Sequence, residues 1–342
     1  MKIILIFLNV LVFTPAALAV DLIQIEKDLA GNGVQGTIHG AVEAQGLYVF
    51  SYRSPTDFFD HVEMSLVSDD AELSHQLETL NRHDLVLIQG SFLKNPSPQK
   101  HILLSSLKVV KKFDSGYPVD PYHHEAVIPD ELLHLNTAIF LVHAVAGDGH
   151  VLVTEYKDSI VPFYVKNAAL TRNLFRNDLV KLKFVAQENP GQPLHLLLDD
   201  NDPSPLVVIE SIQAIHGKPG TIEGALVLFP QSPEIIFNVF AVDQPLDGGL
   251  KRQYTIVNFE DPALFKAIRD ALQAAWDRHA GEYVNGRNKL VSTRVWVRVS
   301  GVFNEVSANQ ANPQILVSSL ADVKIIESAQ LTSTVTERVL RP

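Results

Sequence analysis

The heptapeptide Gly36-Thr37-Ile38-His39-Gly40-Ala41-Val42 recurs in this chain as Gly220-Thr221-Ile222-Glu223-Gly224-Ala225-Leu226. The far ends of the two copies also match, because Ile102-Leu103-Leu104-Ser105-Ser106-Leu107 corresponds to Ile315-Leu316-Val317-Ser318-Ser319-Leu320. Matches at both ends, in the same order, are typical of a chain built from copies of one structural unit. The sequence therefore predicts an internal repeat.

The first copy has the pattern of five strands with a helix between the third and the fourth. Leu73, Leu77 and Leu80 lie at helical spacing behind the acidic pair Asp69-Asp70, which indicates the helix. A middle copy keeps the same order of elements, but in its last strand Asp199-Asp200 is followed by an insertion, 201–205. In the first copy the strands are expected over residues 37–44, 47–52, 62–67, 84–92 and 101–110.

This arrangement of strands and helix resembles the OB fold, a small Greek-key barrel. The resemblance is one of pattern and covers almost all of the chain after residue 19. We therefore predict a mainly β protein with short helices, made of three tandem OB-fold-like five-stranded Greek-key barrels. The expected parts are module 1 (20–114), a linker (115–135), module 2 (136–216), module 3 (217–329, with an insertion at 274–292) and a tail (330–342).

The first 19 residues have the pattern of a cleavable secretory signal. Lys2 precedes an apolar stretch over 3–13, and Ala17-Leu18-Ala19 resembles a cleavage site before Val20. The apolar stretch is shorter than the ~20 residues that a membrane-spanning helix needs. We expect a periplasmic or secreted protein with no transmembrane span after cleavage.

The composition of the chain limits its chemistry. It has 28 Lys and Arg against 39 Asp and Glu, a net charge of −11, which opposes general attraction to the phosphates of nucleic acids. The absence of cysteine excludes a disulfide scaffold, a thiolate metal site, a cysteine nucleophile and a lipid anchor on cysteine.

An aromatic stripe in module 1 is the first candidate site. Tyr48, Phe50 and Tyr52 share one face of the second strand, because side chains alternate along a strand. Facing outward, they would form a stacking platform on the surface with which OB barrels bind oligonucleotides and oligosaccharides. Facing inward, they would belong to the core, and the sequence leaves both alternatives open. The stripe is not repeated in module 3, which counts against a triplicated binding surface.

A cluster of cations in module 3, here called the basic island, is the second candidate. Glu282 is the only acid between residues 278 and 298. Arg294, Trp296 and Arg298 alternate along one expected strand, so guanidinium and indole groups would share a face toward an anionic ligand. The alternative is a solvated strand whose charges deter pairing with another sheet. The cations of the island are Arg278, Arg287, Lys289, Arg294 and Arg298.

Short motifs give no support for catalysis or metal binding. Residues 31–36 spell G-x-G-x-x-G but lack the preceding strand and the following helix of a dinucleotide site. His123-His124-Glu125 lies in a linker with prolines, and adjacent histidine side chains converge on one metal only in a specific turn. We therefore predict no catalytic residue, no metal and no cofactor.

These observations favour a non-enzymatic binding or scaffold protein of the cell envelope. Its expected partner is an envelope protein or a small or oligomeric ligand. The first alternative is binding of single-stranded nucleic acid or an acidic oligosaccharide through the aromatic stripe and the basic island. The second alternative is an enzyme with an unrecognised site between modules.

Overall fold

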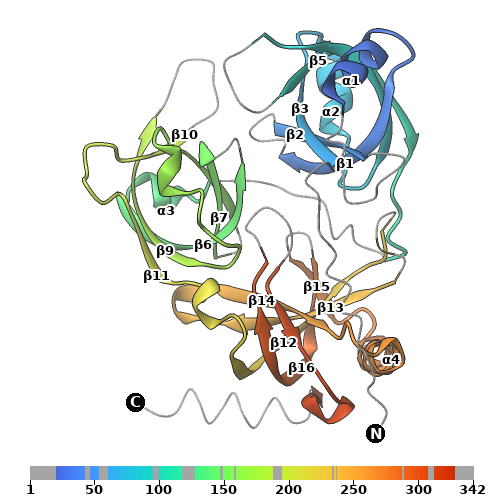
Figure 1. Ribbon diagram of the computed structural model, residues 1–342, viewed down its shortest axis with the longest axis vertical. Coiled ribbons are helices and arrows are strands. Elements are labelled where there is room, and N and C mark those ends of the chain that lie inside the picture. Colours follow the sequence, from blue (N-terminus) through green and yellow to red (C-terminus); the bar gives the residue numbers. More distant parts are fainter. Residues whose placement is uncertain are drawn as a thin grey trace, which may run out of the picture.

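Three sheets, each around its own core, make up the protein in this computed structural model (Figure 1). The signal segment, the tail, His123-His124-Glu125 and Arg287 all lie outside the described residues. Within the described ranges, no helix is long and apolar enough to cross a membrane. The structure describes residues 21–42, 47–53, 61–94, 100–117, 128–146, 149–157, 159–187, 195–232, 235, 237–286, 289–306 and 312–327.

Module 1 is a closed five-stranded barrel with the strand order β1-β2-β3-β5-β4. β3 and β5 pair in parallel, and the other neighbours are antiparallel. Asp21 and Asp70 each accept two backbone N–H bonds at the starts of α1 (Leu22–Ala30) and α2 (Ala71–Glu78). The strands are β1 (Val34–Val42), β2 (Leu47–Arg53), β3 (His61–Val67), β4 (Leu85–Phe92) and β5 (His101–Lys111).

Module 2 repeats this order, and its ring closes where β10 pairs with both β8 and β9. The acidic insertion splits the fifth strand in two, so β11 continues it along β9. Short helices are α3 (Asp130–Leu133), η3 (Ala168–Leu170) and η4 (Gln213–Ile215). The strands are β6 (Thr137–Ala146), β7 (Val151–Tyr156), β8 (Ser159–Tyr164), β9 (Leu179–Gln187), β10 (His195–Leu198) and β11 (Leu206–Glu210).

Module 3 closes through the pairing of β12 with β16, and β15 and β18 add to β16. Residues 274–292 contain the end of α4 (Pro262–Arg278), β15 and the start of β16, and the two strands form a hairpin. Two short helices are η5 (Asp247–Gly249) and η6 (Leu320–Asp322). The strands are β12 (Pro219–Phe229), β13 (Val239–Pro245), β14 (Lys251–Val257), β15 (Tyr283–Gly286), β16 (Lys289–Asn304), β17 (Gln314–Leu316) and β18 (Val323–Glu327).

These three barrels, each with a helix or helical turn between its third and fourth strands, confirm the predicted mainly β, OB-like architecture. Inward residues of alternating strands fill each barrel, as Phe140, Phe163 and Phe184 do in module 2, with edge-to-face ring centroids 5.1–5.9 Å apart. Phe175 of module 2 and Tyr117 of the linker pack against the core of module 3. Module 2 and the linker are therefore attached to module 3 by apolar contacts.

The strand register confirms the match at the far ends of the repeat. Phe92 pairs with Ile102 in module 1, and Phe303 pairs with Ile315 in module 3. Ile102 and Ile315 are the first residues of the two matched hexapeptides. The two hexapeptides are therefore equivalent in space as well as in sequence.

The near-end heptapeptides, in contrast, are displaced by four residues. Counting back from Phe92 and Phe303 makes Val86 equivalent to Val297, and their partners in the first strands are Gly36 and Gly224. A Cβ at Gly36 would lie 2.5 Å from the carbonyl oxygen of Ser51, and one at Gly224 would lie 2.0 Å from that of Asp243. Gly224, not Gly220, is thus the counterpart of Gly36, because both must let the second strand approach closely.

Candidate functional site

The aromatic stripe of module 1 belongs to the core. Tyr48 and Phe50 are buried, and Tyr52 packs partly buried against the same cluster. Phe50 lies opposite buried Met64 in the β2–β3 register, so this side of both strands faces the barrel interior. Rings enclosed there cannot stack on a ligand at the surface, and the outward-platform alternative is wrong for Tyr48 and Phe50.

The basic island places Arg294, Trp296 and Arg298 together on the outward face of β16, where they alternate with buried valines. Their charges do not stand alone. Arg294 lies 3.2 Å from Glu282, and Arg298 lies 2.6 Å from Glu223 on β12. The outward strip exists, but carboxylates neutralise its arginines.

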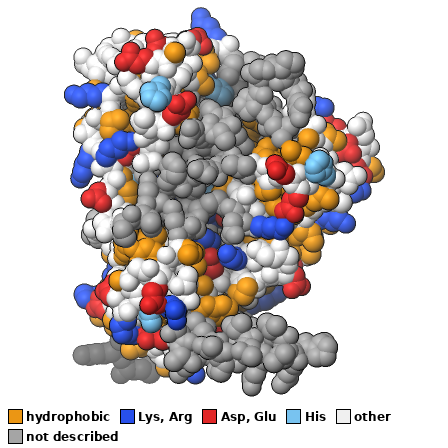
Figure 2. Space-filling model, turned by 180° about the vertical axis from the view of Figure 1, so that it is seen from behind, with side chains coloured by type: hydrophobic (Ala, Val, Ile, Leu, Met, Phe, Trp, Pro, Cys, Tyr) orange, Lys and Arg blue, Asp and Glu red, His pale blue; other side chains and the backbone are white. Residues whose placement is uncertain are grey.

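The other described cations of the island are paired in the same way. The Arg278 Nε donates to Glu327 over 2.9 Å, and Lys289 Nζ lies 3.0 Å from Asp243. Asp243, Glu223 and Glu327 come from strands remote in the sequence, so composition between 278 and 298 did not reveal them. Figure 2 shows acidic and basic side chains interspersed on one face of the molecule.

The outer face of the second and third strands is where an OB barrel holds its ligands. In module 3, Asp243 of β13 pairs with Gln253 of β14 on this face, and both are buried. The Gln253 side-chain amide donates to Asp243 over 2.8 Å, and Lys289 completes the pairing of that carboxylate. This face of module 3 is therefore covered.

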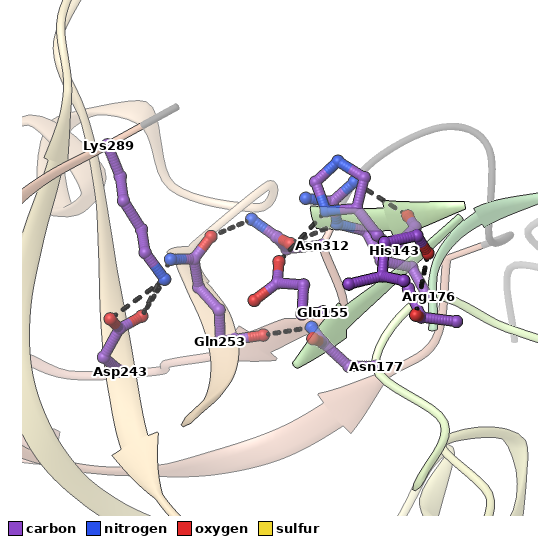
Figure 3. A network of polar contacts seen from close by, with 10 residues as sticks. His143, Glu155, Arg176, Asn177, Asp243, Gln253, Lys289 and Asn312 are labelled. Atoms are coloured by element: carbon purple, nitrogen blue, oxygen red, sulfur yellow. Dashed lines mark hydrogen bonds and ion pairs between the residues drawn. The ribbon is translucent and has the colours of Figure 1, made fainter. Parts of the chain in front are cut away.

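A turn of module 2 supplies the cover (Figure 3). The Asn177 side-chain amide donates to the Gln253 carbonyl oxygen over 2.8 Å, and Arg252 Nε donates to the Asn177 carbonyl oxygen over 3.2 Å. Arg176 Nε donates to Asn312 over 2.5 Å, and Asn312 in turn donates to the Gln253 side chain. The OB outer face of module 3 thus binds a segment of polypeptide from the same chain.

Local sequence shapes this turn. Asn177 has a left-handed backbone (φ 69°), which asparagine tolerates better than most residues. The Asp178 carboxylate accepts backbone N–H bonds from Phe175 over 2.8 Å and from Ile212 over 2.7 Å. Burial raises the pKa of Asp178, while these bonds and the charge of Arg252 act in the opposite direction. The Asp178 carboxylate therefore stabilises the turn through hydrogen bonds to its backbone and to residue 212.

Module 1 contains the same turn. His83 has φ 70°, and Asp84 accepts the Asn81 N–H over 2.8 Å, as Asp178 accepts that of Phe175. Burial, with the charges of Arg82 and His39, lowers the pKa of His83 to about 3, so its imidazole is neutral at physiological pH. The repeat of Arg82-His83-Asp84 as Arg176-Asn177-Asp178 is a sequence signal for this shared turn.

The outer face of module 1 carries Glu63 of β3, hydrogen-bonded to His39 of β1. Burial would raise the pKa of Glu63, but the hydrogen bond and charge of His39, with the charges of His61 and Arg82, lower it. The Glu63 side chain is 37% exposed, whereas Gln253, its counterpart on the same face of module 3, is buried. Ser51 and Ser65 on the outer face of module 1 are buried as well, so module 1 presents Glu63, and not the whole face, to solvent.

Module 2 repeats the histidine–carboxylate pair as His143 and Glu155, 3.0 Å apart. His39 and His143 both occupy the β-bulge of a first strand, where the register with the second strand shifts. Pairing across strands could not be read from the sequence, so neither pair was predicted. Throughout the described part of the chain, no cluster of three or more histidine or acidic side chains is arranged to hold a metal.

Comparisons with known proteins add no family. No family model matches the chain, and no curated protein matches it. Solved structures that resemble it include a murine DNA-binding protein bound to double-stranded DNA (14% identity, 52% of this chain and 99% of that one, TM-score 0.19). Others are the tetrameric p202 HIN2 (12%, 52% and 93%, 0.20) and Drosophila Unr CSD456 (11%, 86% and 97%, 0.16). Similarity at this level says nothing about what this chain binds.

The docking of module 2 on module 3 depends on the Asn177 amide. Asn177→Asp keeps the size and the tolerance for a left-handed backbone, but a carboxylate cannot donate to the Gln253 carbonyl. We expect a loss of about 1–3 kcal/mol in the docking free energy, seen in calorimetry as separation of the module 2 and module 3 transitions. His83→Asn at the equivalent turn of module 1 is the control, and it should leave that coupling intact. Unchanged coupling in Asn177→Asp would contradict the docking role.

Proposed function

We propose that this chain is an exported, non-catalytic protein-binding protein, in which the outer face of module 1 recognises a polypeptide segment of a cell-envelope partner. The observation that carries the proposal is the use of the same face in module 3. There, the Gln253 carbonyl oxygen accepts from the Asn177 side-chain amide, and the Arg252 guanidinium donates to the Asn177 carbonyl oxygen. The outer face of one module therefore already binds a polypeptide segment within this molecule.

The chemistry of the module 1 face suits a polypeptide ligand. Glu63 offers carboxylate oxygens to N–H donors, and His61 is exposed beside it in β3. Arg53 and His61 are neighbours in the β2–β3 register, which adds a donor group at the edge of the face. Donors and acceptors of both kinds match a peptide backbone, which also presents both. A polyanion would instead meet the Glu63 carboxylate.

Export rests on the segment 1–19, and we propose cleavage between Ala19 and Val20. Ala19→Arg places a large charge where a small residue is required, so precursor should accumulate in the producing cells. The mass and the N-terminal sequence of the secreted protein give the measurement. A protein that stays in the cytoplasm with Met1 or Lys2 intact would contradict export.

Substitution of Glu63 tests the binding face. Peptides are first selected on the purified protein from a random dodecapeptide library. Their affinity for the Glu63→Arg variant should be at least about tenfold lower, because a charged hydrogen-bond acceptor becomes a repelling donor. Isothermal calorimetry measures the affinity. NMR shifts on peptide addition should fall in β1, β2 and β3.

Glu78→Arg is the matched control. Glu78 lies on α2 of the same module and pairs with His75, just as Glu63 pairs with His39. This substitution makes the same charge change away from the face and should leave peptide affinity unaltered. Equal losses in both variants, or shifts confined to module 3, would remove the module 1 face from the proposal.

Single-stranded nucleic acid or an acidic oligosaccharide is a second candidate ligand class. The observation that favours it is the shared outward face of Arg294, Trp296 and Arg298. Binding there must open two ion pairs in a protein of net charge −11, which makes it weak and steeply dependent on salt.

A titration with oligo-dT and an acidic polysaccharide at two salt concentrations tests the second candidate. Binding that falls with salt and is lost in the Arg294→Ala/Arg298→Ala double variant, but not in Lys27→Ala, would support it. Absence of binding to both polymers at low salt would eliminate it.

A further inference from the structure

A hollow of about 350 Å³ lies on module 2, beside the ends of β8 and β10, and no function described above uses it. Its lining includes His150, Tyr164, Lys166, Leu197 and Asp200. This volume is at the lower end of the ~300–1,000 Å³ typical of small-ligand pockets. The hollow therefore suits a ligand the size of one or two sugar rings.

Tyr164 forms the aromatic wall of this hollow. It is the last residue of β8 and 41% exposed, and it pairs in register with Leu197 of β10 and Val151 of β7. Its neighbours Phe163 and Leu196 are buried, so the alternation of the strand holds Tyr164 outward. An exposed ring beside a leucine gives a flat apolar surface for the C–H face of a pyranose.

Polar groups stand around this apolar wall. His150 Nδ1 lies 2.8 Å from the Val165 carbonyl oxygen, which can only accept, so Nδ1 donates. In the neutral imidazole, this leaves Nε2 as an acceptor for a hydroxyl group. Lys166 and Asp200 form an ion pair 2.5 Å long at the rim, which adds a donor and an acceptor.

The charge of this rim selects among ligands. Lys166 and Asp200 cancel, so the rim attracts neither anions nor cations, and the Asp200 carboxylate would oppose a phosphate. A purely apolar ligand would leave the Nε2 of His150 without a hydrogen-bond partner. Hydroxyl groups, which both donate and accept, match all three side chains.

We propose that this hollow binds a neutral sugar unit, with the ring stacked on Tyr164 and its hydroxyls bonded to His150, Lys166 and Asp200. The site lies where the third strand (β8) and the fifth strand (β10) of module 2 pair, beside the start of the second strand. It is separate from the peptide face of module 1, so the protein would hold a polypeptide and a glycan at once.

Titration of the intact protein with cellohexaose, maltohexaose and chitohexaose tests this proposal. We expect at least one to bind with NMR shifts at Tyr164, Leu197 and Asp200. Tyr164→Ala should weaken that binding by about tenfold or more, and Asp200→Asn by a few-fold. Phe259→Ala, which removes an aromatic ring that is 67% exposed elsewhere, should leave it unchanged.

Two results would overturn the sugar site. One is that none of the three hexasaccharides binds at millimolar concentration, or that the bound one is insensitive to Tyr164→Ala. The other is that hexathymidylate binds the same residues and is lost in Tyr164→Ala, which would make the hollow a nucleotide site. Glu63→Arg should not affect the sugar titration, so failure of the peptide face and failure of this site remain distinguishable.

Discussion

The amide of Asn177, buried against the main chain of Gln253, is the contact on which the arrangement of this protein depends. A buried amide that loses its partner costs about 1–3 kcal/mol, so modules 2 and 3 are held in the orientation that satisfies it. The left-handed backbone of Asn177 and the Asp178 carboxylate behind it make the turn that reaches across. Docking then covers the outer face of module 3, whereas Glu63 on the outer face of module 1 is exposed, and the binding proposal follows from this asymmetry.

Small changes in one repeated turn produce the asymmetry. In module 1 the Asp84 carboxylate accepts from the Phe113 N–H and from Lys112, and the Phe113 ring packs on the edge of His83 at 5.2 Å. The residues that follow β5 therefore supply the partners of this turn. In module 2 the equivalent N–H comes from Ile212, whose side chain belongs to the core of module 3. One copy of the turn therefore ends within its own barrel, while the other joins two barrels.

The sequence predicted the architecture because alternation and turn residues are local properties. Asp70 begins a helix as expected, and the hexapeptides at 102–107 and 315–320 are equivalent in the structure. Pairing between distant strands is not local. For this reason the local sequence does not reveal the acids that neutralise Arg278, Lys289 and Arg298, and the heptapeptide match differs by four residues from the pairing of the strands. Alternation also cannot tell which side of a strand faces inward, so Tyr48 and Phe50 were candidates for both core and surface. The histidine–glutamate pairs and the Tyr164 hollow depend on such tertiary neighbours.

Carboxyl footprinting tests the central claim most directly, which is that Asp243 on the outer face of module 3 is covered and Glu63 on the outer face of module 1 is open. Labelling the native protein with a water-soluble carbodiimide and an amine, followed by mass spectrometry, reports each carboxylate separately. The account predicts rapid modification of Glu63 and protection of Asp243, whose side chains are 37% and 1% exposed. Modification of Asp243 at the rate of Glu63 would show that the face of module 3 is open in solution, and would contradict the account.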